Sequence, residues 1–212
     1  MKKREMKPGT LLAPLPAVLV TSSDGTEDNV LTIAWTGIIN SEPPMTYVSV
    51  TKKRYSHHII EKSGEFVINL VNEDLARAAD FCGVRSGRNM DKFAECSLTK
   101  AKASTVGAPL IAESPVNIEC KVKEIHEYGS HDMFVAEITT VNAAEELFDE
   151  AGRLCLDKAG LICFSHGEYF ALKSKSLGRF GHSVMKPKTR KRINKENNEK
   201  KRMAKSSKKL GK

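Results

Sequence analysis

Hydroxyl and cationic side chains gather in one short segment, residues 46–58, with the sequence TYVSVTKKRYSHH. A strand pattern ends within this segment and a helix pattern begins. Hydroxyls, cations and the free N–H groups of a helix start together form a site suited to a phosphate monoester. The alternative is a solvated turn with ordinary surface charges. The candidate residues are Ser49, Thr51, Lys52, Lys53, Arg54 and Ser56.

Familiar catalytic motifs are absent from the sequence. It contains no GxGxxG or GxxxxGK[ST] loop, no GxSxG turn around a nucleophilic serine and no HExxH zinc motif. The closely spaced histidines, His57 with His58 and His126 with His131, have poor spacing for a metal, so no metal site is expected. A chain without an evident nucleophile often binds a cofactor that carries the chemistry itself.

The elements that would position this segment are mainly short strands. Turn residues bound β-branched runs at 16–23, 29–36, 46–51, 65–71, 159–164 and 169–172. Alternation in 115–128 and 131–143 predicts a long antiparallel hairpin. Helices are expected at 56–62, between Ser56 as N-cap and Gly64, and at 73–82, between Asn72 and Gly83; residues 86–93 are expected to form a loop. The expected fold is mainly β with short helices, an antiparallel barrel with helical insertions.

The positive charge is concentrated at one end of the chain. The 212 residues include 34 basic and 26 acidic side chains, a net charge of +8, and residues 186–212 alone hold 13 basic and 2 acidic ones. Subtraction leaves residues 1–185 with 21 basic and 24 acidic side chains, a net charge of −3. We expect a polar leader (1–9), a domain (10–185) and a basic, disordered tail (186–212). The tail is a candidate for weak nonspecific nucleic-acid contact, although a solubilising role is the simpler interpretation.

The sequence also predicts the compartment. The apolar run at 11–20 is shorter than the roughly 20 residues that span a bilayer, so no membrane association is expected. Pro14 and Pro16 interrupt it and Glu5 precedes it, which argues against a secretory signal and predicts a cytoplasmic location. Five widely spaced cysteines without a CxxC pair predict reduced thiols.

Several segments occur in an order that resembles a known family. They are NVLTIAW (29–35), Pro43-Pro44, VSVTKKRYSHHII (48–60), SGEFVINL (63–70), SGRNMDKF (86–93) and GSHDMFVAEI (129–138). From about residue 10 to 173 the chain resembles the flavin reductase-like family, the FMN-binding split β-barrels that include the flavoredoxins. The resemblance implies a homodimer with FMN held noncovalently near the subunit interface. It implies hydride transfer from NADH or NADPH to flavin, or, alternatively, a flavoredoxin-type carrier that passes electrons to a partner redox protein.

Two groups of residues match cofactor positions of that family. The first group would lie along the isoalloxazine ring and consists of Asn29, Thr32, Ile33, Ala34 and Trp35. The second group would hold the phosphate and the ribityl chain and consists of Ser49, Thr51, Lys53, Arg54, Ser56 and His57. Within it, Lys53 is an alternative to Arg54, and the sequence does not decide which of them points inward. For Trp35 the alternative is a core aromatic.

The resemblance also suggests interpretations for four further residues. Lys92 matches a position near the flavin phosphate or the neighbouring subunit; otherwise it is an exposed loop lysine. His131 matches a histidine near the exposed face of the flavin, where nicotinamide stacks; otherwise it is a turn histidine. Cys82 either lies near the flavin or is a buried structural thiol. Relatives often have glycine at the position of Ala136, whose methyl group is expected to narrow the approach to the ring. No residue is assigned a certain catalytic role, because the flavin itself carries the chemistry.

Overall fold

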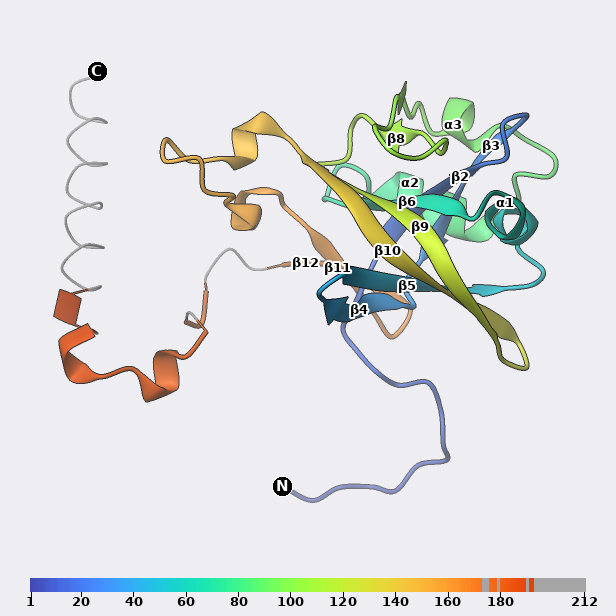
Figure 1. Ribbon diagram of the computed structural model, residues 1–212. Helices are drawn as coiled ribbons and strands as arrows, with labels where there is room; N and C mark the ends of the chain where they lie inside the picture. The colour runs from blue at the N-terminus through green and yellow to red at the C-terminus, as the bar shows by residue number, and fades with distance from the viewer. Residues whose placement is uncertain (173–175, 179, 190, 193–212) are drawn as a thin grey trace. The chain divides into compact units, whose positions relative to one another are not determined.

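Short antiparallel strands supply most of the regular structure. The computed structural model describes residues 1–172, 176–178, 180–189 and 191–192, and its contacts divide the chain into two units, Met1–Leu172 and Lys173–Lys212. Most of the expected basic tail lies outside the described residues. The strands of the described part belong to the first unit (Figure 1): β1 (Leu15–Pro16), β2 (Val18–Ser23), β3 (Asp28–Ile33), β4 (Thr36–Ser41), β5 (Pro44–Thr51), β6 (Glu65–Leu70), β7 (Lys100–Ala101), β8 (Leu110–Ile111), β9 (Val116–Glu127), β10 (His131–Ala143), β11 (Ile162–Ser165) and β12 (Glu168–Ala171).

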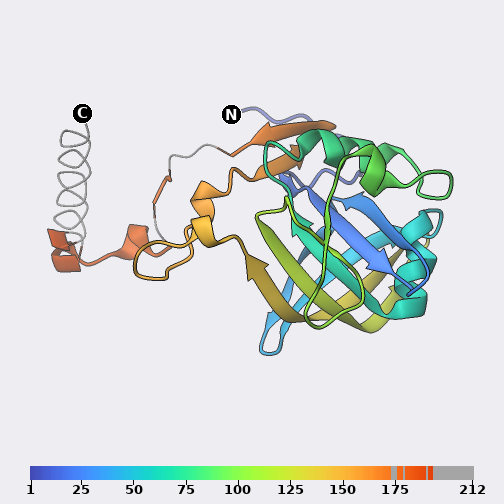
Figure 2. The same cartoon turned by 90° about the horizontal axis from the view of Figure 1, so that it is seen from above.

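The main sheet has seven strands in the order β3-β2-β6-β9-β10-β5-β4. Its two edge strands, β3 and β4, are consecutive in the chain and are separated by Ala34 and Trp35 alone. The sheet must therefore curl until its edges approach each other, as Figure 2 shows for the twisted strands. We call this crossing between the two edges, at Ala34 and Trp35, the seam. Beside it the Ser49 N–H of β5 donates to the Trp35 carbonyl at 2.9 Å, which extends the β4–β5 pairing by one residue. The strand expected over 29–36 therefore ends earlier than predicted, at Ile33, because the chain crosses there from the β3 edge of the sheet to the β4 edge.

The long hairpin expected from alternation is confirmed as β9 and β10. Their pairing runs from Asp132 opposite Glu127 to Ala143 opposite Val116, with two bulges. Strand β10 also pairs with β5, and that register places His131 opposite Thr51. The start of β10 therefore lies beside the end of β5, where the polar segment begins. A three-stranded sheet (β1-β11-β12) and the β7-β8 pair complete the strands of the described part.

The helices with defined bounds are α1 (Tyr55–Ser63), α2 (Ala76–Val84), α3 (Lys92–Glu95), η1 (Glu145–Leu147), η2 (Leu156–Lys158) and η3 (His182–Val184). Residues 187–189 and 191–192 are also helical. Gly64 ends α1 in the left-handed region at φ 67°, as expected. Helix α2 begins later than expected, because Asn72 caps a preceding turn by accepting from the Leu75 N–H. It also continues through Gly83, its expected end, to Val84. The loop expected over 86–93 is wrong at its end, because Asp91 caps α3, which begins at Lys92. Within the described part of the chain, no helix has the length and apolar character needed to cross a membrane.

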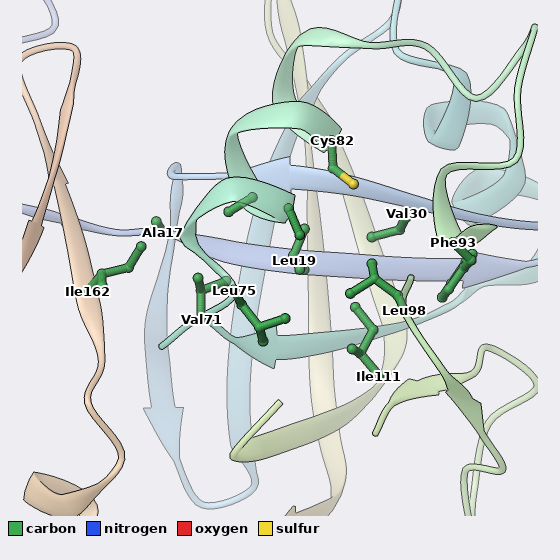
Figure 3. Packing of buried hydrophobic residues seen from close by; sticks show 12 residues of the cluster. Ala17, Leu19, Val30, Val71, Leu75, Cys82, Phe93, Leu98, Ile111 and Ile162 are labelled. Carbon is green, nitrogen blue, oxygen red and sulfur yellow. The ribbon is translucent and has the colours of Figure 1, made fainter. Parts of the chain in front are cut away.

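Two apolar layers hold these elements together. Along β3 the side chains alternate, so Leu31 faces the barrel interior with Phe66 and Phe134. Val30 faces the other side, where α2 and α3 cover the sheet. Figure 3 shows this second cluster, to which α2 contributes Cys82. Burial of each large side chain favours folding by about 1.5–3 kcal/mol, so both faces of β3 are fixed in place.

Candidate functional site

A small cavity of about 70 Å³ opens where β5 turns into α1. Strand β3, the first turn of α1 and the loop after α2 form its walls. We call it the cationic pocket, and its lining residues are Asn29, Leu31, Lys53, Arg54, Tyr55, Ser56, Cys82, Arg85, Ser86, Gly87 and Lys92. Of these described residues four are basic and none is acidic. The pocket is therefore suited to an anion.

Lys92 supplies a buried positive charge to the cationic pocket. Its side chain belongs to a residue that is only 3% exposed, and its Nζ donates to the carbonyls of Cys82 at 3.3 Å and Arg85 at 3.4 Å. Burial lowers the pKa of this ammonium group, and the nearby Arg54 guanidinium lowers it further. An anion in the pocket would offset both effects. The exposed loop lysine, one of the two interpretations of Lys92 from the sequence, is therefore excluded.

The first turn of α1 faces the same pocket. Arg54 is the N-cap residue in an extended conformation, and no side chain caps the helix. The expected N-cap, Ser56, lies inside the helix, because a turn in which the Arg54 N–H donates to the Thr51 carbonyl starts the helix one residue earlier. That prediction was wrong. An N-terminus without a side-chain cap offers backbone N–H groups and a positive dipole end to an anion.

Asn29 and Ser56 form the floor of the cationic pocket. Both are buried, and Asn29 Nδ2 donates to Ser56 Oγ at 2.7 Å. The loop after α2 approaches them so closely that a Cβ atom at Gly87 would lie 2.1 Å from Asn29 Oδ1. Glycine is therefore required at this contact. Arg85, Ser86 and Gly87 were not among the site residues predicted from the sequence, although SGRNMDKF (86–93) contributed to the family resemblance.

A second group of predicted residues meets at the seam of the barrel. The Trp35 ring stacks on the His131 imidazole with a centroid distance of 4.6 Å and an interplanar angle of 32°. Trp35 remains 39% exposed, so it is not a core aromatic. Ser49 lies beside Trp35, because its N–H donates to the Trp35 carbonyl. The His131 Nδ1 is 2.8 Å from the Ser130 hydroxyl.

An apolar cavity of about 440 Å³ adjoins this stacked pair. None of its lining residues carries a charge, and the N-terminal segment 9–12 forms one side of it. The lining residues are Gly9, Thr10, Leu11, Leu12, Leu15, Trp35, Thr36, Tyr47, Ser49, Tyr128 and Met133. The site thus has a cationic part and an uncharged part, and Asn29 and Trp35 sit at the two ends of one continuous stretch of chain.

Other predicted residues have different contacts. The Thr32 hydroxyl donates to the Ala79 carbonyl of α2, and Ile33 is buried in the barrel core. Ala34 follows β3 at the seam. Ala136 is fully buried inside the barrel, so its methyl group cannot narrow an approach from outside. That expectation is corrected: the residue faces the core, where its size matters for packing.

His57 makes a buried hydrogen bond with Asp132 instead of lining the cationic pocket. Its Nε2 lies 2.7 Å from Asp132 Oδ2, and its ring meets Phe134 edge to face at 5.2 Å. Lys52 Nζ lies 3.5 Å from the other oxygen of Asp132. The contact joins α1 to β10, and it indicates a structural role for His57.

Substituting His57→Ala is therefore expected to lower the free energy of unfolding by about 3 kcal/mol, because Asp132 loses its buried partner. Binding of a phosphate monoester in the cationic pocket should change less than about threefold, a difference of under 1 kcal/mol. Urea denaturation and titration with the phosphate monoester measure the two effects, with exposed His58→Ala as the control. Unchanged stability with a large loss of this binding would show that His57 is a ligand-binding residue.

The chain thus folds as a curled antiparallel sheet with a cationic pocket at a strand-to-helix junction. Residues 11–173 match the family model described as flavin reductase like domain. The chain belongs to the flavin reductase-like family.

Individual relatives agree with this assignment. The chain is 32% identical over 165 residues to an uncharacterised protein of Pyrococcus abyssi, an alignment that covers 78% of this chain and 94% of the relative. Among solved structures it is similar to flavoredoxin of Desulfovibrio vulgaris (Miyazaki F), with a TM-score of 0.81, 31% identity and coverage of 87% and 100% of the two chains. An FMN-binding protein from Thermus thermophilus shares the fold, with a TM-score of 0.71, 24% identity and coverage of 84% and 98%.

Proposed function

We propose that this protein binds FMN and transfers hydride from NADH or NADPH to flavin. The observation that carries the proposal is the buried ammonium group of Lys92, which faces Arg54 and the uncapped start of α1 in a pocket lined by no acidic residue. A phosphate monoester is the ligand that such a pocket fits best. The FMN-binding relative and the family assignment support the same cofactor.

The proposed roles of the residues follow from their places. Lys92, Arg54 and Ser56 would hold the phosphate by charge-assisted hydrogen bonds, with Lys53 and Arg85 adding positive potential at the rim. Asn29 would fix the position of Ser56. The stacked Trp35 and His131 would border the ring, where apolar atoms exclude water. When bound, the flavin supplies hydride acceptance, so the protein itself contributes position and electrostatics.

The activity is tested by mixing the FMN-loaded protein with NADH or NADPH under argon. Bleaching of the oxidised flavin absorbance at a rate that depends on nucleotide concentration is the expected result. Negligible bleaching by either nucleotide, with the flavin still bound, would contradict the reductase and would point instead to an electron carrier with a protein partner.

His131 provides a specific prediction for this reaction. Its substitution by alanine is expected to slow flavin reduction by roughly tenfold, because the nicotinamide loses a positioning contact. FMN affinity should fall by less than the reduction rate, because His131 does not line the cationic pocket that holds the phosphate. Exposed His126→Ala, on the same hairpin, is the control. Equal reduction rates in the two variants would contradict a role for His131 at the nicotinamide.

The proposal includes a homodimer. Leu12, Ile38 and Tyr128 are exposed by 80%, 74% and 59%, and Leu12 and Tyr128 line the apolar cavity. Large exposed apolar side chains around a cavity favour association with a second copy. Light scattering of the purified protein at micromolar concentration should give twice the mass of one chain; a monomer would contradict this part.

The five free thiols accord with the reducing cytoplasm, which is the proposed location.

A further inference from the structure

Cys82 and Cys96 bring two thiols into contact beside the cationic pocket. Their sulfur atoms lie 3.9 Å apart, one on α2 and the other immediately after α3. A disulfide requires about 2.0 Å between the sulfurs, so each would move by only about 1 Å to bond. Figure 3 shows Cys82 on α2 within the cluster that also contains Phe93 of α3. The apolar packing between the two helices therefore holds the thiols together.

The two thiols differ in their access to solvent. Cys82 is fully buried and lines the cationic pocket. Cys96 is partly exposed and lines a different cavity of about 610 Å³ beside α2. Burial, with a smaller contribution from the adjacent Cys96, raises the pKa of the Cys82 thiol to about 12, although Lys92 opposes the shift. A soluble oxidant would therefore meet Cys96 first, with Cys82 waiting as the second thiol.

The chain between these cysteines carries much of the cationic pocket. Residues 83–95 include Arg85, Ser86, Gly87 and Lys92, all of which line it. The Lys92 ammonium group already bonds to the carbonyl of Cys82. A bond between Cys82 and Cys96 would close this segment into a ring and would restrict its conformations.

We propose that Cys82 and Cys96 form a redox-sensitive dithiol that a hydroperoxide converts to a disulfide, and that this disulfide slows the release of FMN. The second half of the statement rests on the proposed FMN site, whereas the first half does not. A pocket segment that is already ordered loses less freedom when the phosphate binds, so it holds the ligand longer.

The reaction proceeds in two balanced steps with hydrogen peroxide. The Cys96 sulfur, as thiolate, attacks one peroxide oxygen; the O–O bond breaks, the other oxygen leaves as hydroxide, and with the thiol proton it becomes water. Cys96 is then a sulfenic acid. The Cys82 sulfur attacks the Cys96 sulfur, the S–O bond breaks, and the hydroxyl group leaves as water with the Cys82 proton. Two thiols are oxidised, and one peroxide is reduced to two waters.

The bond itself is tested without flavin. The reduced full-length protein is treated with a small excess of hydrogen peroxide, and peptide mapping then locates the oxidised cysteines. The expected product is a peptide pair joined through Cys82 and Cys96, with a mass loss equal to two hydrogens and slower tryptic cleavage after Arg85 and Arg88. Sulfinic acid at Cys96, or faster oxidation of Cys155 and Cys163 with the pair intact, would overturn the proposal.

The effect on the pocket is tested by the dissociation rate of FMN. Oxidation of the FMN-loaded protein should slow dissociation by roughly threefold or more, and a thiol reductant should restore the original rate. Cys96→Ser should abolish the effect of peroxide, whereas Cys155→Ser should retain it. A disulfide that forms without changing the rate of FMN release would overturn the proposal that it slows this release. If the reduced protein binds no FMN while the disulfide and the tryptic protection still form, the proposed function fails and the dithiol stands.

Discussion

Substitution of Lys92 by methionine is expected to weaken FMN binding by about 100-fold, or about 2.7 kcal/mol. The buried ammonium group is proposed to make a charge-assisted hydrogen bond to the phosphate, and loss of one partner of such a pair costs about 2–5 kcal/mol. Methionine keeps the length and the apolar contacts of the lysine stem. The free energy of unfolding without flavin should change by less than about 1 kcal/mol, because the loss of two carbonyl contacts is offset by the removal of a buried charge.

Flavin titration and urea denaturation of the same Lys92→Met sample separate the two effects. Lys100→Met is the matched control, because Lys100 is exposed and pairs with Asp28, and neither residue lines the cationic pocket. A variant that binds FMN as tightly as the wild type would contradict the assignment of Lys92 to the phosphate. A variant that loses several kcal/mol of stability would show instead that Lys92 is needed mainly for the fold.

The substitution Gly87→Ala is expected to reduce FMN affinity by about 30- to 100-fold, or roughly 2–3 kcal/mol. The new Cβ would lie 2.1 Å from Asn29 Oδ1 and 2.7 Å from Asn29 Cγ, so one of the two elements must shift. Asn29 is buried and its Nδ2 is bonded to Ser56, so a shift disturbs the floor of the cationic pocket. The loop after α2 is exposed at Arg85 and Ser86, so much of the change should occur there and the protein should remain folded.

Gly129→Ala is the control for this variant. A Cβ atom at Gly129, in the β9–β10 turn, would have no neighbour within 4 Å. Calorimetric titration with FMN and circular dichroism of both variants make the comparison. Unaltered FMN affinity in Gly87→Ala would mean that the contact between Gly87 and Asn29 does not shape the binding site.

The sequence was most informative where a local pattern determines the structure. Strict alternation around Gly129-Ser130 predicted the β9–β10 hairpin, and Gly64 marked the end of α1. The predicted end of β3 was wrong because the chain crosses at Ala34 from one edge of the sheet to the other, and the positions of those edges depend on all seven strands together. The prediction of Ser56 as N-cap was wrong for two reasons. The turn between Thr51 and Arg54 starts the helix earlier, and the Ser56 hydroxyl accepts a hydrogen bond from Asn29.

The site was predictable where the family resemblance supplied positions. Asn29, Arg54, Ser56 and Lys92 were predicted together, and the structure places all four at one pocket. Arg85 was missed because its contribution depends on how α2 turns toward β3, which no local pattern encodes. His57 was predicted at the cofactor but does not line the cationic pocket. Helical periodicity turns its side chain inward, toward Asp132.

Parallel calorimetric titrations of the flavin-free protein with FMN and with riboflavin test the central claim most directly, because the two ligands differ only in the phosphate. The proposed site predicts that FMN binds about 100-fold more tightly than riboflavin, and that Lys92→Met removes most of this difference. Equal affinities for the two flavins in the wild type would contradict the claim that the cationic pocket holds the cofactor phosphate.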